Sequence, residues 1–546
     1  MNGSGVQLHN LDILAIVLYI VAMLALGWWA TKRVKNTEGY FVGGRRVPGW
    51  AVGVSMLGTA ISSVTFLAYP GSAFAGNWSR LVPGLMLPIA TIIGAYFFVV
   101  FFRRTMFVSA YQYFEHRFGS WGRSYASAMW SLASMYRMGS ILYLMSLPIR
   151  LITGWDILTV MIVFGLLITI YTMMGGLEAV IWTDVVQTVV LFLGGLITIL
   201  IVFIKVPGGP LEVLAPAWNA GKFGVAVDVD FTFIRDTFWV LALSGLVGNI
   251  QEYSTDQTKI QRYLAADSDR GALTAIWTVG IGCIPLWSLF MFVGTCLWVY
   301  YSHHPEAMEL ARQTLGTDLR SDTVYPLFII TVLPPFIGGL VISAVLAAAM
   351  SSIDSSMNGT ATALTTDFYK RHFSKDRTDK HYLLVARIIT TILGFVAIAW
   401  AYFLYSLGQG AILDTLFFIG SILAGGLGGF FILGFISNRT NWQGALIGVI
   451  AGIIIIIWNT VSHFAVTGSG IEITGYFYVG LKPWAPIAFR VHPFLINVMS
   501  NVVVLVVGYI ASYFFPKPAL EEIRGMTWWT RRMESPVEAE ASEASE

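Results

Sequence analysis

The chain has 546 residues, of which 56% are hydrophobic and only 12% are charged, and its formal net charge is +2. Soluble domains carry about twice this charged fraction. The composition, with a mean hydropathy of +0.70, therefore predicts an all-α polytopic membrane protein. It excludes a disordered chain, a nucleic-acid-binding protein and a soluble enzyme, and the continuous apolar runs argue against a β-barrel.

Apolar runs separated by polar turns predict about thirteen transmembrane helices, because each crossing needs roughly 20 residues. The run 324–368 is too long for one crossing, and its Pro334-Pro335 pair predicts a kink. Lys and Arg gather on one side of the membrane if the N-terminus is outside, which places the C-terminus inside. The predicted spans are residues 11–31, 48–71, 81–102, 122–152, 156–175, 178–205, 236–262, 269–301, 324–368, 381–407, 410–437, 441–462 and 491–515.

Two polar stretches within these spans are candidate cation sites. Residues 54–71 are rich in Gly, Ser and Thr. Local unwinding there would free carbonyl oxygens for a cation, although a helix interface of small residues is the alternative. Residues 347–360 combine four serines with Asp354. These are hard oxygen ligands suited to an alkali cation, unless the serines bond only to their own helix.

Two charged residues also lie inside predicted spans. Placing a charged side chain within the membrane costs free energy, so its presence there indicates a functional role. Asp184 is a cation ligand, a helix-end cap or one half of a gate salt bridge. Arg137 lies in the middle of 122–152 and stays charged, so it needs an acidic partner or an anionic ligand. It forms either a structural ion pair or a bidentate site for a substrate carboxylate. No nucleophile–base pair, phosphate-binding loop or zinc spacing predicts an enzyme.

Six segments, in this order, resemble the sodium:solute symporter family, which includes sodium/glucose, sodium/proline, iodide and sialic acid transporters. The resemblance runs over residues 10–515. It implies a LeuT-type five-plus-five inverted repeat and alternating access with Na+ as the co-transported ion. The segments are FVGGRRVPGW, SSVTFLAYPG, SAYQYFEHRFG, GGLEAVIWTDVVQ, STDQTKIQRYLAA and AAAMSSIDSSMNG.

The resemblance also implies a domain organisation for a monomeric, multi-pass protein of the plasma membrane. The N-terminus would lie outside and the C-terminus inside. The expected parts are an N-terminus with first helix and inner loop (1–47), a first five-helix repeat (48–205), an external loop (206–235), a second five-helix repeat (236–437), two peripheral helices (438–515) and an acidic tail (516–546).

Two sodium sites follow from the resemblance. The main site would use backbone carbonyls and serine hydroxyls, on Gly58, Ile61, Ala348, Ser351 and Ser352. A second site, found in some members, would use Asp184, Ser351, Asp354 and Ser355. Asp354 stands where the family has a serine, so it could strengthen this site, titrate, or pair elsewhere.

The expected substrate depends on Arg137, because an arginine at the corresponding position holds the substrate carboxylate in sialic acid transporters. Ser62 and Thr65 match two of the assisting hydroxyls, whereas a third falls on Ala60. Asp256 and Gln257 align with a sugar-contacting region. We therefore expect a carboxylate-bearing solute such as sialic acid or another acidic sugar. A neutral sugar or polyol is the alternative, followed by an amino acid or monocarboxylate; a channel or a solute sensor is the alternative from another class.

Overall fold

The computed structural model describes residues 9–105, 107–225, 228–309, 321–406, 420, 422–423, 425–462, 464–467, 470–473, 491–531 and 533. Within these residues the chain is helical apart from one hairpin, in which β1 (Phe464–Thr467) pairs with β2 (Gly470–Ile473). Eight described segments are long and apolar enough to cross a membrane, in agreement with the predicted helical membrane protein. They are Asn10–Thr31, Trp78–Thr105, Ile157–Lys205, Asp269–His303, Ile337–Phe373, Asp379–Ser406, Trp442–Thr460 and Phe494–Phe514.

Several helices coincide with single predicted spans. In each of them a predominantly apolar sequence lies between polar turns, and helical backbone hydrogen bonds satisfy the peptide groups within the membrane, with an internal proline in α9 (Pro148) and in α14 (Pro285). They are α1 (Asn10–Thr31), α9 (Ser120–Thr153), α14 (Asp269–His303), α18 (Asp379–Ser406), α21 (Trp442–Ser462) and α22 (Phe494–Ala511). The predicted span 410–437 is described mainly as α20 (Leu427–Ile436), and residues 407–419 lie outside the described part.

The expected helix breaks occur where the sequence is weakest as a helix. α3 (Gly49–Thr59) and α4 (Ser63–Ala75) are separated at residues 60–62, where Ser62 is extended (φ −98°, ψ 175°). The Pro334-Pro335 pair lies between α16 (Val324–Val332) and α17 (Ile337–Ala363), which continues into the π-helix η5 (Leu364–Phe373). α10 (Ile157–Lys205) reverses at Gly176, whose φ of 57° favours glycine.

Other segments depart from the expected spans. The span predicted at 236–262 is two helices, α12 (Phe238–Thr255) and α13 (Gln257–Ala265), because Asp256 is extended and its side chain caps α13. The loop 206–235 contains a helix, α11 (Pro210–Asn219). The helical run from 78 to 105 consists of η2 (Trp78–Leu81), α5 (Val82–Leu85), α6 (Leu87–Ile93), η3 (Gly94–Val99) and α7 (Val100–Thr105). Short helices outside the spans are α2 (Thr37–Val42), η1 (Gly43–Arg45) and α8 (Gln112–Phe118).

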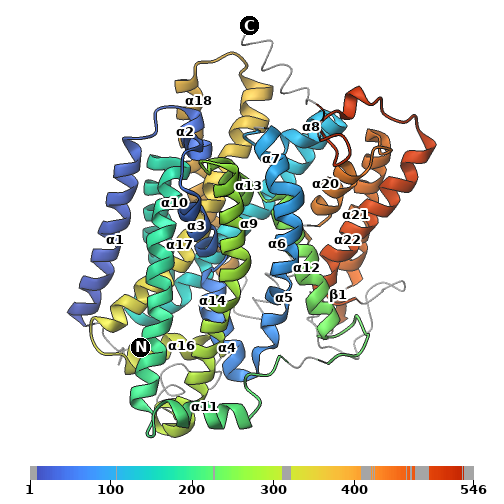
Figure 1. Cartoon of the computed structure of the whole chain (residues 1–546). Helices are drawn as coiled ribbons and strands as arrows, with labels where there is room; N and C mark the ends of the chain where they lie inside the picture. The colour runs from blue at the N-terminus through green and yellow to red at the C-terminus, as the bar shows by residue number, and fades with distance from the viewer. Residues whose placement is uncertain are drawn as a thin grey trace.

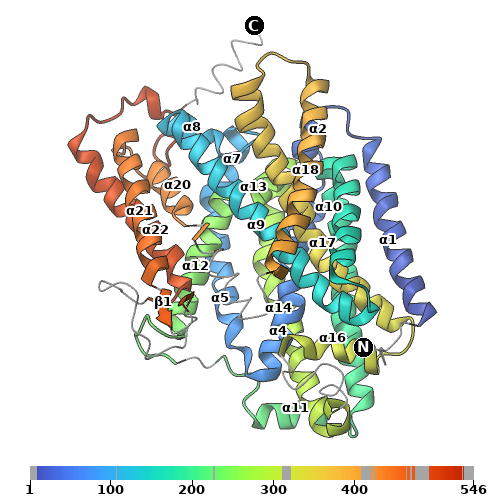
Figure 2. The same ribbon diagram turned by 180° about the vertical axis from the view of Figure 1, so that it is seen from behind.

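The helix α17 lies at the centre of the molecule, whereas α1 and the α21–α22 pair lie at opposite sides (Figures 1 and 2). α17 contacts α1, α3, α9, α10 and α18, and nearly all of its residues are buried. Its sequence consists largely of Gly, Ala and Ser, which allow neighbouring helices to approach closely. The polar side chains of α17 are therefore enclosed by protein rather than by lipid.

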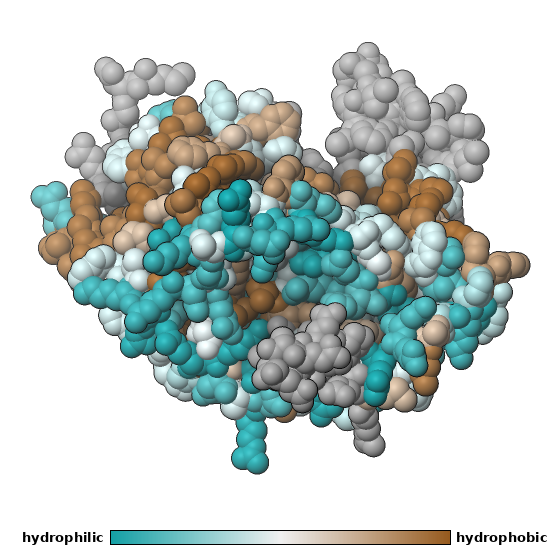
Figure 3. Space-filling model, turned by 90° about the horizontal axis from the view of Figure 1, so that it is seen from above, coloured by the Kyte–Doolittle hydropathy of each residue, from teal (hydrophilic) through white to brown (hydrophobic). Residues whose placement is uncertain are grey.

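One end of the helical body carries many cationic side chains, and we call it the basic face. Figure 3 views this end and shows hydrophilic residues over its centre, with hydrophobic residues along part of the rim. Helix ends at this face meet the water boundary of the membrane, where Lys and Arg side chains are tolerated. We define the basic face by Lys32, Arg33, Arg103, Arg104, Lys370 and Arg371, at the ends of α1, α7 and η5.

The N-terminus of α17 is capped by a residue of α1. Its own N-cap residue, Phe336, provides no side-chain hydrogen bond. Instead Asp12 Oδ1 accepts from the backbone N–H groups of Phe336 (2.9 Å) and Gly339 (2.8 Å). Since the first turn of a helix leaves N–H groups without intrahelical partners, this carboxylate fastens the central helix to α1.

We expect the substitution Asp12→Ala to destabilise the protein by about 1–2 kcal/mol, because loss of a helix cap has that cost. The melting temperature of the purified chain would fall by several degrees. Asp12→Asn is the matched control, since its side-chain oxygen can still accept both bonds. Equal melting temperatures for the alanine variant and the original chain would contradict this role.

Candidate functional site

The break between α3 and α4 lies against the serine-rich part of α17, and oxygen atoms from both elements converge there. The Ser351 hydroxyl is 3.3 Å from the carbonyl oxygens of Gly58 and Ala348. The Ser352 hydroxyl is 3.4 Å from the carbonyl oxygens of Thr59 and Ala348. These distances are long for O–H···O hydrogen bonds, which cluster near ~2.7–2.8 Å. Four of the five residues expected at the main cation site are thus together.

The unwound segment also brings a carbonyl to α17 that was not among the expected ligands. The Thr59 carbonyl contacts Ser352, whereas Ile61 is fully buried and its N–H donates to the Gly58 carbonyl (3.1 Å). Thr59 was not singled out from the sequence because every residue has a carbonyl. Only the conformation of the break determines which carbonyls point toward α17.

The residues expected at the second cation site surround a guanidinium group that was not predicted there. Arg262 Nη2 donates to Asp184 Oδ2 (2.8 Å), to Ser355 Oγ (2.6 Å) and to Thr59 Oγ1 (3.0 Å). Arg262 Nε also donates to Ser55 Oγ (2.9 Å), and this hydroxyl donates to Asp184 (2.6 Å). Both members of the ion pair are almost completely buried, with 1% and 0% of their side chains exposed. Of the alternatives for Asp184, a buried salt bridge is therefore present.

Asp354 adds a second carboxylate beside this ion pair. Its Oδ2 accepts from the Tyr171 hydroxyl (2.8 Å), and its Oδ1 accepts from the Ser355 hydroxyl (3.2 Å). Asp184 Oδ1 is buried without a hydrogen-bond partner among the described residues. The cluster thus contains two buried carboxyl groups and one guanidinium, so a single buried cation faces two acidic side chains.

A cavity of about 570 Å³ adjoins the main cation site. It extends between the α3–α4 break, α9, α12–α13, α14 and α17, and Ser352 forms part of its wall. A volume in the range of about 300–1,000 Å³ suits a small organic ligand. Four of the five residues expected to bind substrate line it, namely Ser62, Thr65, Arg137 and Asp256.

Arg137 extends from α9 to the cavity and forms an ion pair there. Its Nη2 donates to Asp256 Oδ2 (3.1 Å), and 40% of its side chain remains exposed. Asp256 Oδ1 accepts from the backbone N–H of Thr258 (2.8 Å) and from the Thr258 hydroxyl. Asp256 therefore caps α13 and orients the guanidinium at the same time. A guanidinium has five N–H donors, so the exposed part of Arg137 retains donors for a ligand.

Gln257 lies elsewhere. Its side chain is fully buried, accepts from the Ala110 N–H (2.7 Å) and donates to the Val108 carbonyl (3.0 Å). It fastens α13 to the segment before α8 and does not line the cavity. A second ion pair, Lys259 Nζ to Glu252 Oε2 (2.9 Å), does line it. In an unbroken helix residues i and i+7 are two turns, about 10.5 Å, apart, so this contact depends on the break between α12 and α13.

The cavity between apolar helices, with a cluster of cation-type oxygen ligands beside it, is typical of a membrane transporter for a small solute. The sequence profile of the sodium:solute symporter family matches residues 40–452. The chain belongs to this family, in which solute movement is coupled to sodium.

Individual relatives agree with this assignment. The chain is 34% identical over 457 residues to the sodium/sialic acid symporter SiaT of Proteus mirabilis, covering 83% of this chain and 90% of SiaT. It is 30% identical over 511 residues to the sodium/sialic acid symporter NanT of Aliivibrio fischeri, covering 93% and 94%. A solved substrate-bound outward-open structure of a Na+-coupled sialic acid symporter superposes with a TM-score of 0.82 at 30% identity, covering 93% of this chain and 98% of that one.

Proposed function

We propose that this protein couples inward sodium movement to the uptake of sialic acid or a closely related acidic sugar. The observation that carries the proposal is the placement of Arg137 and Ser352 in the wall of one cavity. An oriented guanidinium recognises a carboxylate, while the Ser352 hydroxyl belongs to the cation cluster. The 34% identity to a sodium/sialic acid symporter supports the same substrate.

Sodium at the main site would bridge the α3–α4 break and α17. Its ligands would be the carbonyls of Gly58, Thr59 and Ala348 and the hydroxyls of Ser351 and Ser352, whose oxygens converge. The Ile61 carbonyl remains a further proposed ligand. Sodium bound there would favour one conformation of the transporter over another. Such a difference in sodium affinity between conformations is what couples sodium movement to solute movement. Each sodium gains roughly 2.3 kcal/mol per 100 mV of membrane potential.

The second sodium site is a separate proposal. The Asp184 Oδ1 atom, which has no hydrogen-bond partner among the described residues, and the second buried acid, Asp354, support a cation beside Ser351 and Ser355. The guanidinium of Arg262 supplies the positive charge between Asp184 and Ser355 in this conformation. A sodium ion bound between those two side chains would require Arg262 to withdraw.

The substrate carboxylate would bind to the exposed donors of Arg137, with the hydroxyls of Ser62 and Thr65 nearby. Asp256 would hold the guanidinium in place, so that the pair is neutral before the substrate arrives. This neutral pair also favours a second candidate, a neutral sugar or polyol, which would hydrogen-bond to both partners without bringing a charge. Amino acids and monocarboxylates fit the cavity chemistry less fully, because Lys259 and Glu252 add polar groups suited to a hydroxylated solute.

The topology that accompanies this function is also proposed. Residues 48–205 and 236–437 would form the two inverted five-helix repeats of a LeuT-type fold with about thirteen transmembrane helices. The basic face would lie in the cytoplasm, in accordance with the distribution of Lys and Arg. The N-terminus would then lie outside and the C-terminus inside, and the protein would act as a monomer in the plasma membrane.

A ligand-screening thermal-shift experiment tests the proposal most directly. We expect sialic acid to raise the melting temperature of the purified chain in sodium buffer and to have little effect when choline replaces sodium. A neutral hexose and a polyol serve as controls for the second candidate. In proteoliposomes, uptake should saturate and should require a sodium gradient. Saturable uptake at full rate without sodium would contradict sodium coupling.

A further inference from the structure

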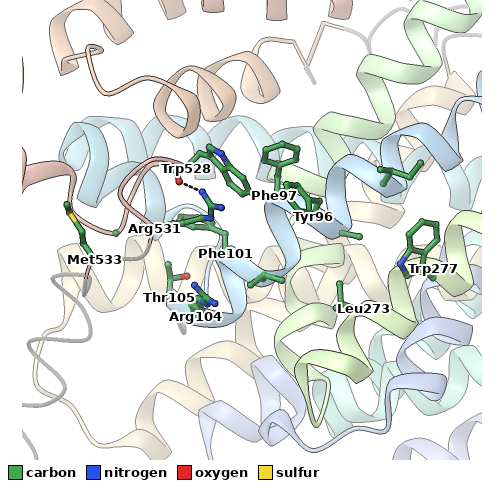
Figure 4. Close-up of a pocket in the computed structure, with 14 residues that line it drawn as sticks. Tyr96, Phe97, Phe101, Arg104, Thr105, Leu273, Trp277, Trp528, Arg531 and Met533 are labelled. Atoms are coloured by element: carbon green, nitrogen blue, oxygen red, sulfur yellow. Dashed lines mark hydrogen bonds between the residues drawn. The ribbon is translucent and has the colours of Figure 1, made fainter.

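A second cavity, of about 540 Å³, opens at the basic face and shares no lining residue with the cavity of the candidate transport site. We call it the aromatic groove, and we define it by the side chains of Tyr96, Phe97, Trp277 and Trp528. Its walls come from the α6–η3–α7 run, the first turns of α14, and Gly525, Trp528, Arg531 and Met533 near the C-terminal end of the described chain (Figure 4). Three separate parts of the chain therefore build it.

The C-terminal wall of the groove is firmly attached to the helices. The Trp528 N–H donates to the Phe435 carbonyl at the end of α20 (2.7 Å). The Trp528 ring packs against Phe97 and Tyr96, with centroid distances of 4.4 and 5.2 Å. The Trp529 indole N–H donates to the Ile436 carbonyl (2.8 Å). The groove is thus a formed feature of the fold.

The groove is apolar at one end and cationic at the other. Arg104 and Arg531 lie toward one end, and Trp277 lies at the opposite end (Figure 4). Ile92 and Tyr96 line the apolar part, and more than half of each side chain is exposed. From Ile92 to Arg104 the helix rises about 18 Å. This length slightly exceeds half of the roughly 30 Å hydrocarbon thickness of a bilayer.

Both arginines retain donors for an anion. Arg531 lies over the Trp528 ring, 3.1 Å from its centroid, and donates to the Trp528 carbonyl. Among the described residues it makes no other hydrogen bond, so most of its five N–H donors are not used there. Arg104 is exposed, and none of the described residues forms a hydrogen bond or ion pair with it. Guanidinium groups bind phosphate in a bidentate manner.

We propose that the aromatic groove binds one anionic phospholipid from the leaflet on the side of the basic face. The phosphate would lie between Arg104 and Arg531, and an acyl chain would follow Tyr96 and Trp277 toward the bilayer centre. The aromatic rings suit the membrane boundary, where Trp and Tyr side chains concentrate. Basic pockets between helix ends are typical sites for anionic headgroups. A soluble phosphate would leave the apolar half of the groove without a partner.

Native mass spectrometry of the purified full-length chain tests this proposal, with dioleoylphosphatidylglycerol and dioleoylphosphatidylcholine as probes. We expect phosphatidylglycerol to be retained in preference to phosphatidylcholine. Each arginine changed to glutamine should weaken retention about five-fold, because a basic residue near an anionic surface contributes on the order of 1 kcal/mol. The double variant Arg104→Gln/Arg531→Gln should therefore lose the preference.

The matched control is Lys35→Gln/Lys375→Gln, which removes two exposed positive charges outside the groove. This control should retain phosphatidylglycerol as the original chain does. Equal losses in the two double variants would overturn the proposal, because binding would then follow total charge. A chain ending at Met533 tests the acidic tail as a competing occupant. Retention that appears only after removal of the tail would assign the groove to the tail and would also overturn the proposal.

Discussion

Replacing Ser352 by alanine is expected to raise the sodium concentration for half-maximal uptake by roughly ten- to hundred-fold, because a hydrogen-bonding partner of a charge contributes about 1.5–3 kcal/mol. The substitution removes one hydroxyl from the main cation cluster and leaves the carbonyls of Gly58, Thr59 and Ala348 in place. Uptake as a function of sodium concentration in proteoliposomes measures the effect. Ser352→Thr, which retains the hydroxyl, should recover part of the affinity.

Ser343→Ala is the matched control for this substitution. Ser343 lies on the same helix, is equally buried and donates to the Gly339 carbonyl (2.8 Å), away from the cation cluster. Its removal should leave the sodium dependence unchanged. If Ser343→Ala and Ser352→Ala shift the sodium dependence equally, the effect reflects the packing of α17, and Ser352 is not a sodium ligand.

The second large effect is expected at Arg137. Arg137→Gln should raise the half-saturating concentration of sialic acid by roughly ten- to hundred-fold, since it removes a charge-assisted interaction with the substrate carboxylate. The methyl ester of sialic acid lacks that negative charge, so its weaker transport should change little. The informative measurement is therefore the ratio of the uptake efficiency for sialic acid to that for its methyl ester, in the variant and in the original chain.

Two further variants separate substrate recognition from structural pairing. Arg137→Gln leaves Asp256 as an unpaired carboxylate, whereas Arg137→Gln/Asp256→Asn replaces the ion pair by two neutral amides. We expect the double variant to fold better and still not to prefer the acid over the ester. Arg150→Gln, at the exposed end of the same helix, is the control. A proportionate loss for acid and ester would identify Arg137 as a purely structural residue.

Local sequence features predicted much of the fold and part of the site. Local unwinding within residues 54–71 is predicted because Gly, Ser and Thr form poor helix, although its exact place at 60–62 is not; the kink before α17 is predicted because proline lacks an N–H group. The serine-rich stretch around Ser351 was predicted as a cation cluster from residue chemistry alone. These features depend on neighbours along the chain, so a single sequence contains them.

Contacts between distant segments were beyond such reasoning. Arg262 was expected only as a basic residue near the membrane boundary, yet the turn at Asp256 directs α13 inward and brings its guanidinium to Asp184. The same turn places Asp256 beside Arg137 and withdraws Gln257 from the cavity. A single extended residue inside a predicted span has no periodic signature, so both consequences required the three-dimensional structure.

The cap that Asp12 provides for α17 also constrains how the protein is assembled. Its two hydrogen bonds join residues separated by 324 and 327 positions. At a synthesis rate of about 5–20 residues per second, roughly 15 to 65 seconds separate the emergence of the carboxylate from that of its partners. During this interval α1 must remain in the membrane while the Asp12 carboxylate accepts hydrogen bonds from water or lipid headgroups. The helix α1 thus reaches its final place only after the central helix has been inserted.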